Sequence, residues 1–202
     1  MSGFGSNQGV SIDLRQGQFS SLGNLNNNVS IAFGAIIENG NGTQFNDSIV
    51  GNQQDNVLAG GAGDDVLEGR SGDDTLTGGF GNDIYRYDLA GDFDTIVEGA
   101  TGGRDTLEIS HVISGQTLDF STDFTARREG NDLVLDLRLD GGPLTGQVRF
   151  EDQGFGRHRT ETIEIGSLRI DATDLFTKAS TENQRFSVLG TSSIFGQLVT
   201  PI

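Results

Sequence analysis

A nine-residue period between Gly42 and Arg86 constrains the fold more than any other feature of this sequence. In register, its five copies read GTQFNDSIV, GNQQDNVLA, GGAGDDVLE, GRSGDDTLT and GGFGNDIYR. They follow the pattern G-G-x-G-x-D-x-U-x, in which U is a large apolar residue. Two copies match at every place, Gly60 to Glu68 and Gly78 to Arg86, and the copy between them departs only at Arg70. The period predicts a repetitive, coiled β architecture.

The residue types within each copy predict a metal-binding turn. Glycine at places one, two and four tolerates positive φ, so the backbone can turn sharply with its carbonyls pointed inward. A carboxylate at place six can close the cage that those carbonyls begin. Calcium takes six to eight such oxygens in flexible geometry, whereas zinc would favour His or Cys, which the repeats lack. The place-six aspartates, and with them several calcium ions, are therefore expected at Asp47, Asp65, Asp74 and Asp83.

Places seven to nine of each copy predict a short strand with one buried residue. The buried residues would be Ile49, Leu58, Leu67, Leu76 and Tyr85. Two copies make one coil, so turns two copies apart should stack about 4.8 Å from each other. Asp47 should then face Asp65, and Asp65 should face Asp83. On the other side of the coil, Asn56 should face Asp74. A cation between stacked carboxylates would turn their repulsion into attraction.

The acidic residues are concentrated in the repeats. The chain has 202 residues and a net charge of −16, and residues Glu38 to Glu108 hold 15 Asp and Glu against 3 Arg, a net of −12. Such a field favours polyvalent cations over nucleic acid or anionic membrane surfaces. Cysteine is absent, and no apolar run reaches membrane length. We therefore predict a soluble chain without membrane insertion, nucleic-acid partner or cleavable N-terminal signal.

One apolar residue per copy makes a thin core. Ordering each residue costs about 1 to 2 kcal/mol of backbone entropy, so the repeats should not fold without metal. We predict a switch that is expanded at cytosolic calcium and compact outside the cell.

The segments on either side of the repeats predict a cap and looser coils. Ser11 to Leu14 and Val29 to Ile37 are strand-like, and the second stretch alternates apolar residues at Ile31, Phe33, Ala35 and Ile37. Residues 1–41 are expected to cap the first coil. After the repeats, Asp94 and Asp105 still resemble place six but lie eleven residues apart. They predict one or two further sites at most.

Residues 109–177 show an ordinary antiparallel β pattern. Strands are expected at Phe124 to Glu129, Leu133 to Leu139 and Val148 to Phe150, and a hairpin at Thr162 to Ile170. Asp171 or Thr173 would cap a short helix through Leu175 and Phe176, and Asp132 is interpreted as a turn residue.

The expected fold is all-β: a right-handed parallel β-roll at 42–108, an N-terminal strand cap at 1–41, a C-terminal antiparallel β domain at 109–177, and a tail at 178–202.

Two stretches carry a resemblance to a known family. NVSIAFGAIIEN with the repeats that follow it resembles the C-terminal calcium-binding region of serralysin-type metalloproteases, within the RTX superfamily. The opening SGFGSNQGVSIDLRQGQFSSLGNL resembles the segment that precedes those repeats. From Asp83 to about Phe176 the chain is more similar to the domain that often follows RTX repeats in secreted proteins.

The resemblance implies a ligand set. It assigns metal binding to the place-six side chains, here Asp47, Asn56, Asp65, Asp74, Asp83, Asp94 and Asp105, and to Glu38 at the first site. It adds the carbonyls of places two and four, here Thr43, Phe45, Asn52, Gln54, Gly61, Gly63, Arg70, Gly72, Gly79 and Gly81, with place one contributing Gly60, Gly69 and Gly78. Phe45, Gln54 and Asn56 depart from the pattern, so the tightest sites are expected between Asp65 and Asp83 and beside Asp74.

The resembled family also has a catalytic zinc domain with HExxH on a helix, which this chain lacks. Its two histidines, His111 and His158, are far apart and have no recognisable motif, and no G-x-S-x-G occurs. The chain alone is predicted not to be an enzyme. The resemblance implies a secreted, monomeric module with an upstream catalytic domain, exported by a type I secretion transporter through an uncleaved signal in residues 178–202.

An accessory or adhesive module is the alternative. Its acidic roll or terminal β domain would bind a polysaccharide or a cell surface, with Phe155 and Arg157 to Arg159 holding an anionic sugar. An HExxH motif encoded upstream would favour the protease, and a tandem adhesive array would favour the alternative.

Overall fold

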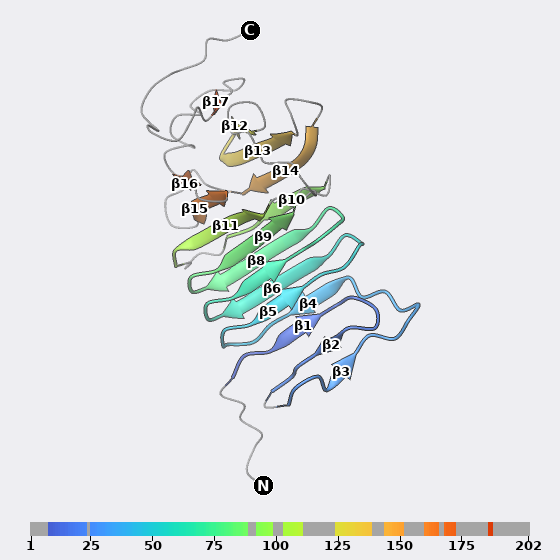
Figure 1. The fold of residues 1–202 in the computed structure, drawn as a ribbon. Helices are drawn as coiled ribbons and strands as arrows, with labels where there is room; N and C mark the ends of the chain where they lie inside the picture. The colour runs from blue at the N-terminus through green and yellow to red at the C-terminus, as the bar shows by residue number, and fades with distance from the viewer. Residues whose placement is uncertain are drawn as a thin grey trace.

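The computed structural model describes residues 8–23, 25–88, 92–98, 103–110, 124–138, 144–151, 160–165, 168–172 and 186–187. Figure 1 shows short strands stacked one above another along a single axis. In chain order they are β1 (Ser11–Asp13), β2 (Phe19–Ser20), β3 (Val29–Ser30), β4 (Asn39–Asn41), β5 (Ser48–Val50), β6 (Val57–Ala62), β7 (Val66–Glu68), β8 (Thr75–Phe80), β9 (Ile84–Asp88), β10 (Phe93–Ile96), β11 (Asp105–Ser110), β12 (Phe124–Glu129), β13 (Asp132–Arg138), β14 (Leu144–Phe150), β15 (Thr160–Ile165), β16 (Leu168–Asp171) and β17 (Phe186–Ser187).

Consecutive repeat strands alternate between two parallel sheets, which makes the repeats a parallel β-roll. One sheet has the order β1-β5-β7-β9-β11-β15-β16, and the other runs β17-β12-β13-β14-β10-β8-β6-β4. Ile49 pairs with Leu67 and Leu67 with Tyr85, which confirms the coil of two copies. Leu58 pairs with Leu76 in the facing sheet. Each repeat therefore contributes one strand and one turn, and turns of alternate copies stack in two columns.

The core of the roll contains one residue from each copy, as predicted. Ile49, Leu58, Leu67, Leu76 and Tyr85 are buried, with exposed fractions between 0% and 2%. Their neighbours along the strands are more exposed, so the pattern alternates. In β6 and β8 the strand continues past place nine into the next copy, which is longer than the sequence predicts.

The coils continue beyond the repeats. Thr95 of β10 pairs with Thr75, and Thr106 of β11 pairs with Ile84. Asp94 and Asp105 thereby fall into the two columns of turns, although their spacing differs from nine residues. The β-roll therefore extends at least to β11.

The C-terminal strands add to both sheets of the roll. β12, β13 and β14 are antiparallel neighbours, and β15 pairs with β16, as expected for two hairpins. β14 also pairs in parallel with β10, and β15 pairs in parallel with β11. Buried residues of these strands belong to the same hydrophobic cluster as the roll. The predicted domain boundary near residue 108 stays a prediction.

The N-terminal segment differs from its prediction in one place. β1 pairs with β5 and covers the first coil, but only Val29–Ser30 of the expected strand at Val29 to Ile37 forms β3, which pairs with β2. Phe33 is 87% exposed and Gly34 has a φ of 85°. The prediction of a strand that extends to Ile37 is therefore wrong.

Other predictions lie outside the described residues. They concern the helix through Leu175 and Phe176, both histidines, the stretch around Arg157 to Arg159, and the tail from 178, apart from β17. Within the described part of the chain, no helix is long and apolar enough to cross a membrane.

Candidate metal centre

The place-six side chains form a continuous ladder along each column of turns. In one column, the Oδ1 atoms of Asp65, Asp83 and Asp105 accept the backbone N–H of Asp47, Asp65 and Asp83 at 2.7, 2.8 and 2.8 Å. In the other column, Asp74 accepts the N–H of Asn56 at 2.7 Å, and Asp94 accepts that of Asp74 at 3.0 Å. Each carboxylate therefore contacts the preceding coil, and the sequence prediction that these residues face one another is confirmed.

The second carboxylate oxygen is left without a hydrogen bond in the central repeats. The Oδ2 atoms of Asp65, Asp74 and Asp83 are buried and have no hydrogen-bond partner. The side chains are at most 1% exposed. A buried carboxylate oxygen without a donor costs free energy unless a cation or a proton compensates it. These three oxygens therefore mark positions where a cation would be stabilised.

The electrostatics of these carboxylates agree with their geometry. Burial raises the pKa of Asp65 to about 7, and the neighbouring Asp83 and Asp47 carboxylates add to the rise. Burial likewise raises the pKa of Asp74 to about 7 and that of Asp83 to about 6. The pKa of Asp94 rises to about 8, again by burial first. The columns thus hold several carboxylates that are costly to ionise together without a compensating positive charge.

The first turn of each column is satisfied by the protein itself. Asp47 accepts the N–H of Val10 through Oδ1 and that of Thr43 through Oδ2, both at 2.5 Å. Asn56 accepts the N–H of Asn52 at 2.8 Å, and its amide donates to carbonyls of Ile37 and Glu38 at 3.4 Å. The side-chain oxygens of the first turns therefore have hydrogen-bond donors from the protein, which the Oδ2 atoms of the central turns lack.

Glycine at place one is required by the carboxylate of the same copy. A Cβ added to Gly60 would lie 2.2 Å from Oδ2 of Asp65, and one added to Gly78 would lie 2.2 Å from Oδ2 of Asp83. Gly69 has the same relation to Asp74, at 2.1 Å. The unpartnered oxygen thus lies in a cradle that any side chain at place one would fill.

Glycines at places two and four have the backbone conformation that the pattern predicts. Gly61, Gly63 and Gly81 have φ between 115° and 125°, and Gly72 and Gly79 have a φ of 110°. The carbonyl oxygens of one coil point at the glycines of the next: a Cβ on Gly81 would lie 2.1 Å from the oxygen of Gly63, and one on Gly79 would lie 2.2 Å from that of Gly61. The carbonyl oxygens of Gly61 and Gly63, two of the predicted metal ligands, thus lie between stacked turns.

Three further predicted ligands accept backbone hydrogen bonds through their carbonyl oxygens. The Glu38 side chain is exposed, and its carbonyl accepts the N–H of Val57 at 2.8 Å. The Thr43 carbonyl accepts the N–H of Ala62 at 3.0 Å, and that of Asn52 accepts the N–H of Ser71 at 3.3 Å. A carbonyl oxygen has two lone pairs, so these bonds do not preclude a further ligand.

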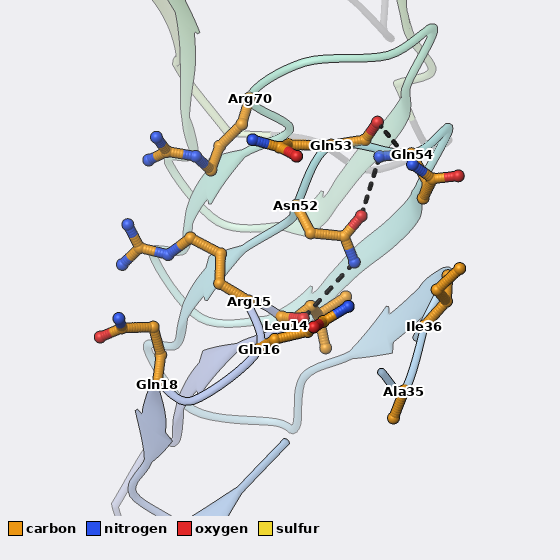
Figure 2. A pocket seen from close by; sticks show the side chains of 10 residues that line it. All are labelled: Leu14, Arg15, Gln16, Gln18, Ala35, Ile36, Asn52, Gln53, Gln54 and Arg70. Atoms are coloured by element: carbon orange, nitrogen blue, oxygen red, sulfur yellow. Dashed lines mark hydrogen bonds between the residues drawn. The ribbon is translucent and has the colours of Figure 1, made fainter. Parts of the chain in front are cut away.

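Arg70 occupies a glycine place with a φ of 78°. Its guanidinium lies 3.0 Å from Glu68, while Arg15 pairs with Asp13. Figure 2 shows both arginine side chains beside a hollow of about 420 Å³, where the Asn52 side chain also lies. Two cationic groups line this hollow, so its chemistry does not suit a metal ion.

Place five carries a signal that the pattern G-G-x-G-x-D-x-U-x leaves unassigned. All five copies have Asn or Asp there, namely Asn46, Asp55, Asp64, Asp73 and Asn82. Their side-chain oxygens accept backbone N–H groups of the following coil at 2.8 to 3.0 Å. The recurrence of Asn and Asp at this place could have identified these residues from the sequence.

Side chains alone do not complete a metal site. Within the described residues, no group of three or more His, Asp or Glu side chains is close enough to hold a metal ion. The donor set that fits a cation consists of one carboxylate oxygen per turn together with main-chain carbonyls. Such an all-oxygen set has the chemistry that calcium prefers.

These features define a class of protein: a parallel β-roll with buried carboxylates in its stacked turns. The chain belongs to the family described as Peptidase M10 serralysin C terminal, which matches residues 1–153. It corresponds to the C-terminal, non-catalytic part of the serralysin-type proteases.

The chain is similar to one curated protein over most of its length. It is 43% identical over 167 residues to metallopeptidase AprA of Pseudomonas marginalis, an alignment that covers 80% of this chain and 34% of AprA. The chain thus spans about a third of the length of this relative. A solved structure, the AlgE6R3 subunit of the Azotobacter vinelandii mannuronan C5-epimerase, is 22% identical with a TM-score of 0.46, covering 84% of this chain and 95% of that one.

Proposed function

We propose that this module binds several calcium ions in the turns of its β-roll and folds when it binds them. The observation that carries the proposal is the set of buried Oδ2 atoms without hydrogen bonds in Asp65, Asp74 and Asp83. Each lies beside a glycine cradle and within a column of stacked carboxylates. Calcium would supply the positive charge that these oxygens lack, and it would bridge consecutive coils.

The proposed ligands combine side chains and main chain. Asp65, Asp74 and Asp83 would contribute the carboxylates of the strongest sites, and Asp94 and Asp105 would extend the two columns. The carbonyls of places two and four, with those of place one, would complete the coordination sphere. The sites at Glu38, Asp47 and Asn56 belong to the same proposal, although protein donors already contact Asp47 and Asn56.

Calcium binding and folding would be coupled. One buried apolar side chain per copy gives little hydrophobic stabilisation against the entropy of ordering nine residues. Because the sites require stacked turns, the unfolded chain would bind calcium weakly. The free energy of unfolding would then rise with the logarithm of the free calcium concentration.

We further propose a secreted protein in which this module follows a zinc metalloprotease domain. The support is membership of the serralysin C-terminal family and the length of the AprA relative, of which the chain spans 34%. Low cytosolic calcium would keep the chain expanded for a type I secretion transporter, and extracellular calcium would fold it after export. The module would act as a monomer that stabilises the whole protein outside the cell.

The test is a calcium titration of the 202-residue chain. Isothermal calorimetry measures binding in this titration, and far-ultraviolet circular dichroism measures folding. We expect saturable binding of several ions and a rise of β signal with calcium. Equal β content in excess chelator and in millimolar calcium would contradict coupled folding. Calorimetry without any binding heat at several temperatures would contradict the calcium sites themselves.

A further inference from the structure

Two ladders of side-chain hydrogen bonds run in opposite directions along each column of turns. Place-six N–H groups donate to the carboxylate of the following coil, as between Asp65 and Asp83 at 2.8 Å. Place-five N–H groups donate to the side chain of the preceding coil, as between Asn82 and Asp64 at 2.8 Å. We call the second set the place-five ladder: Asn46, Asp55, Asp64, Asp73 and Asn82.

The place-five ladder has the same geometry in both columns. In one column, the N–H groups of Asp64, Asn82 and Arg104 donate to Asn46, Asp64 and Asn82 at 3.0, 2.8 and 2.9 Å. In the other, the N–H groups of Asp73 and Phe93 donate to Asp55 and Asp73 at 2.9 and 3.0 Å. The ladder side chains are exposed, whereas every place-six side chain of the repeats is buried.

Charge is not what the ladder shares. Asn46 and Asn82 are neutral, and they accept N–H groups at distances equal within 0.2 Å to those of Asp55, Asp64 and Asp73. The common property is a short side chain with an oxygen that reaches the next coil. The exposed acids at place five are therefore explained by hydrogen bonding more directly than by attraction of calcium.

Peptide planarity gives this ladder a consequence for the proposed calcium sites. The N–H of place five and the C=O of place four belong to one trans peptide, so they point in opposite directions. Holding the N–H of Asp64 toward Asn46 thus directs the Gly63 carbonyl toward the following coil. That carbonyl oxygen indeed lies 2.1 Å from where a Cβ of Gly81 would be. The same relation holds for Asn82 and the Gly81 carbonyl, which lies 2.3 Å from the Cβ position of Gly103.

We infer that the place-five side chains are positioning residues, which aim the place-four carbonyls at the calcium ions bound between coils. The inference rests on the proposed calcium function and assigns no metal contact to the ladder itself. The Asn46 side chain orients the Gly63 carbonyl, that of Asp55 orients the Gly72 carbonyl, and that of Asp64 orients the Gly81 carbonyl. Any residue at place five that accepts the same hydrogen bond should preserve the site, whatever its charge.

The experiment compares Asp64→Asn with Asp64→Ala in the 202-residue chain. Losing one hydrogen bond should weaken calcium binding about fivefold to tenfold in Asp64→Ala, while Asp64→Asn should stay within about twofold of the parent. Gln44→Ala, at an exposed place-three position, is the control for truncating a turn side chain and should bind like the parent. An equal loss in Asp64→Asn and Asp64→Ala would show that charge is what matters, and would overturn the inference.

A second measurement separates positioning from a general structural role. Terbium replaces calcium in oxygen sites, and its luminescence lifetimes in H₂O and D₂O count the waters bound to the metal. A misdirected carbonyl should be replaced by water, so the mean count should rise in Asp64→Ala and not in Asp64→Asn. An unchanged count with lowered thermal stability would indicate a merely structural hydrogen bond and overturn the inference.

Two further outcomes are distinguishable. If Asp64→Ala does not fold in excess calcium, Asn46→Ala gives the same test at the Gly63 carbonyl, with Asn46→Asp as its conservative counterpart. If the parent binds calcium but both alanine variants match it, the inference fails and the proposed function stands. If the parent binds no calcium, both fail.

Discussion

Asp65 in the roll and Asp136 in the C-terminal strands are both buried carboxylates, but their partners differ. Asp136 is 5% exposed and lies 3.1 Å from the Arg127 guanidinium and 2.8 Å from the Gln147 amide. Asp65 is 1% exposed, and its Oδ2 atom has no donor. The buried Asp136 thus has a cation of the protein beside it, whereas no hydrogen-bond donor reaches the Oδ2 atom of Asp65.

The hydrophobic cores of the two regions differ in the same sense. In β13 every residue from Leu133 to Leu137 is buried, so this strand is covered on both faces. In β7 only Leu67 is buried and its two neighbours are partly exposed. A thick core with internal ion pairs can be stable by itself, but a thin core with unpaired buried carboxylates requires an external cation. The comparison predicts that calcium dependence is concentrated in the roll.

The largest effect is expected from Asp65→Asn in the roll, when it is compared with the same substitution, Asp136→Asn, in the C-terminal strands. Asp65→Asn places an amide N–H where a cation would lie, and its turn has neighbours on both sides. We expect about two fewer calcium ions and a calcium midpoint of folding that rises about tenfold. Calorimetry and circular dichroism measure both quantities.

Asp136→Asn is the matched control, because it also removes a buried negative charge. It should lower the thermal stability by leaving Arg127 without its partner, but the number of bound calcium ions should not change. Equal loss of calcium ions in both variants would refute the assignment of sites to the roll.

A smaller effect is expected from alanine at two glycines. Gly78→Ala would bring a Cβ to 2.2 Å from Oδ2 of Asp83 and 2.6 Å from the Tyr85 hydroxyl. Overpacking of this kind costs about 1 to 3 kcal/mol, and here it should also raise the calcium midpoint. Thermal melts at several calcium concentrations measure both.

Gly130→Ala is the comparison in the C-terminal hairpin. A Cβ there would have nothing within 4 Å, and the only cost is the φ of 63°, on the order of 1 kcal/mol. The calcium midpoint should stay near that of the parent. A larger shift in Gly130→Ala than in Gly78→Ala would contradict the difference between the regions.

Acidification should partly replace calcium in the roll. The pKa values of Asp65 and Asp74 rise to about 7, and that of Asp94 to about 8, from 3.8. A raised carboxyl pKa means that the folded state binds protons which the unfolded chain has released. The free energy of unfolding of the calcium-free roll should therefore increase as pH falls from about 8 toward about 4.

Circular dichroism in calcium-depleted buffer between pH 8 and pH 5.5 measures this effect. We expect β signal to grow on acidification without calcium, and calcium affinity to fall over the same interval because protons and calcium compete. A β signal that decreases with falling pH in the absence of calcium would be inconsistent with buried, unpaired carboxylates.

The smallest effect is expected at the surface of the C-terminal sheet. Arg149 lies 2.7 Å from Glu129 and 2.9 Å from Asp132, and all three side chains are partly exposed. Arg149→Met should cost about 0.2 to 1 kcal/mol, and the loss should shrink with salt. Urea titrations at two salt concentrations measure it. A change in calcium stoichiometry would be unexpected and would extend the metal-dependent region into these strands.

Local periodicity allowed much of the roll to be predicted from the sequence. A period of nine with one apolar residue leaves few ways to bury that residue, so the positions of Leu58 and Leu67 followed directly. The pairing of Asp65 with Asp83 followed from two copies per coil. The calcium ligands themselves stay predictions.

The pairing of distant strands and the direction of the side-chain hydrogen bonds could not be predicted from local periodicity. The sequence indicates the hairpin of β12 and β13, but not that β14 would pair with β10, since such contacts depend on the whole chain. Alternation at Phe33 predicted a strand, yet this segment has no sheet neighbour beyond Ser30 except a single bridge at Ile31. The two opposed ladders depend on how the turns stack in three dimensions, although the recurrence of Asn and Asp at place five is visible in the sequence.

Hydrogen exchange, resolved by peptide mass spectrometry, tests the central claim most directly. In millimolar calcium, amides of β5 to β9 should be protected; after calcium removal they should exchange at the rates of an unfolded chain. Peptides from β12 and β13 should lose much less protection. Strong protection of β5 to β9 in excess chelator would contradict a calcium-dependent roll.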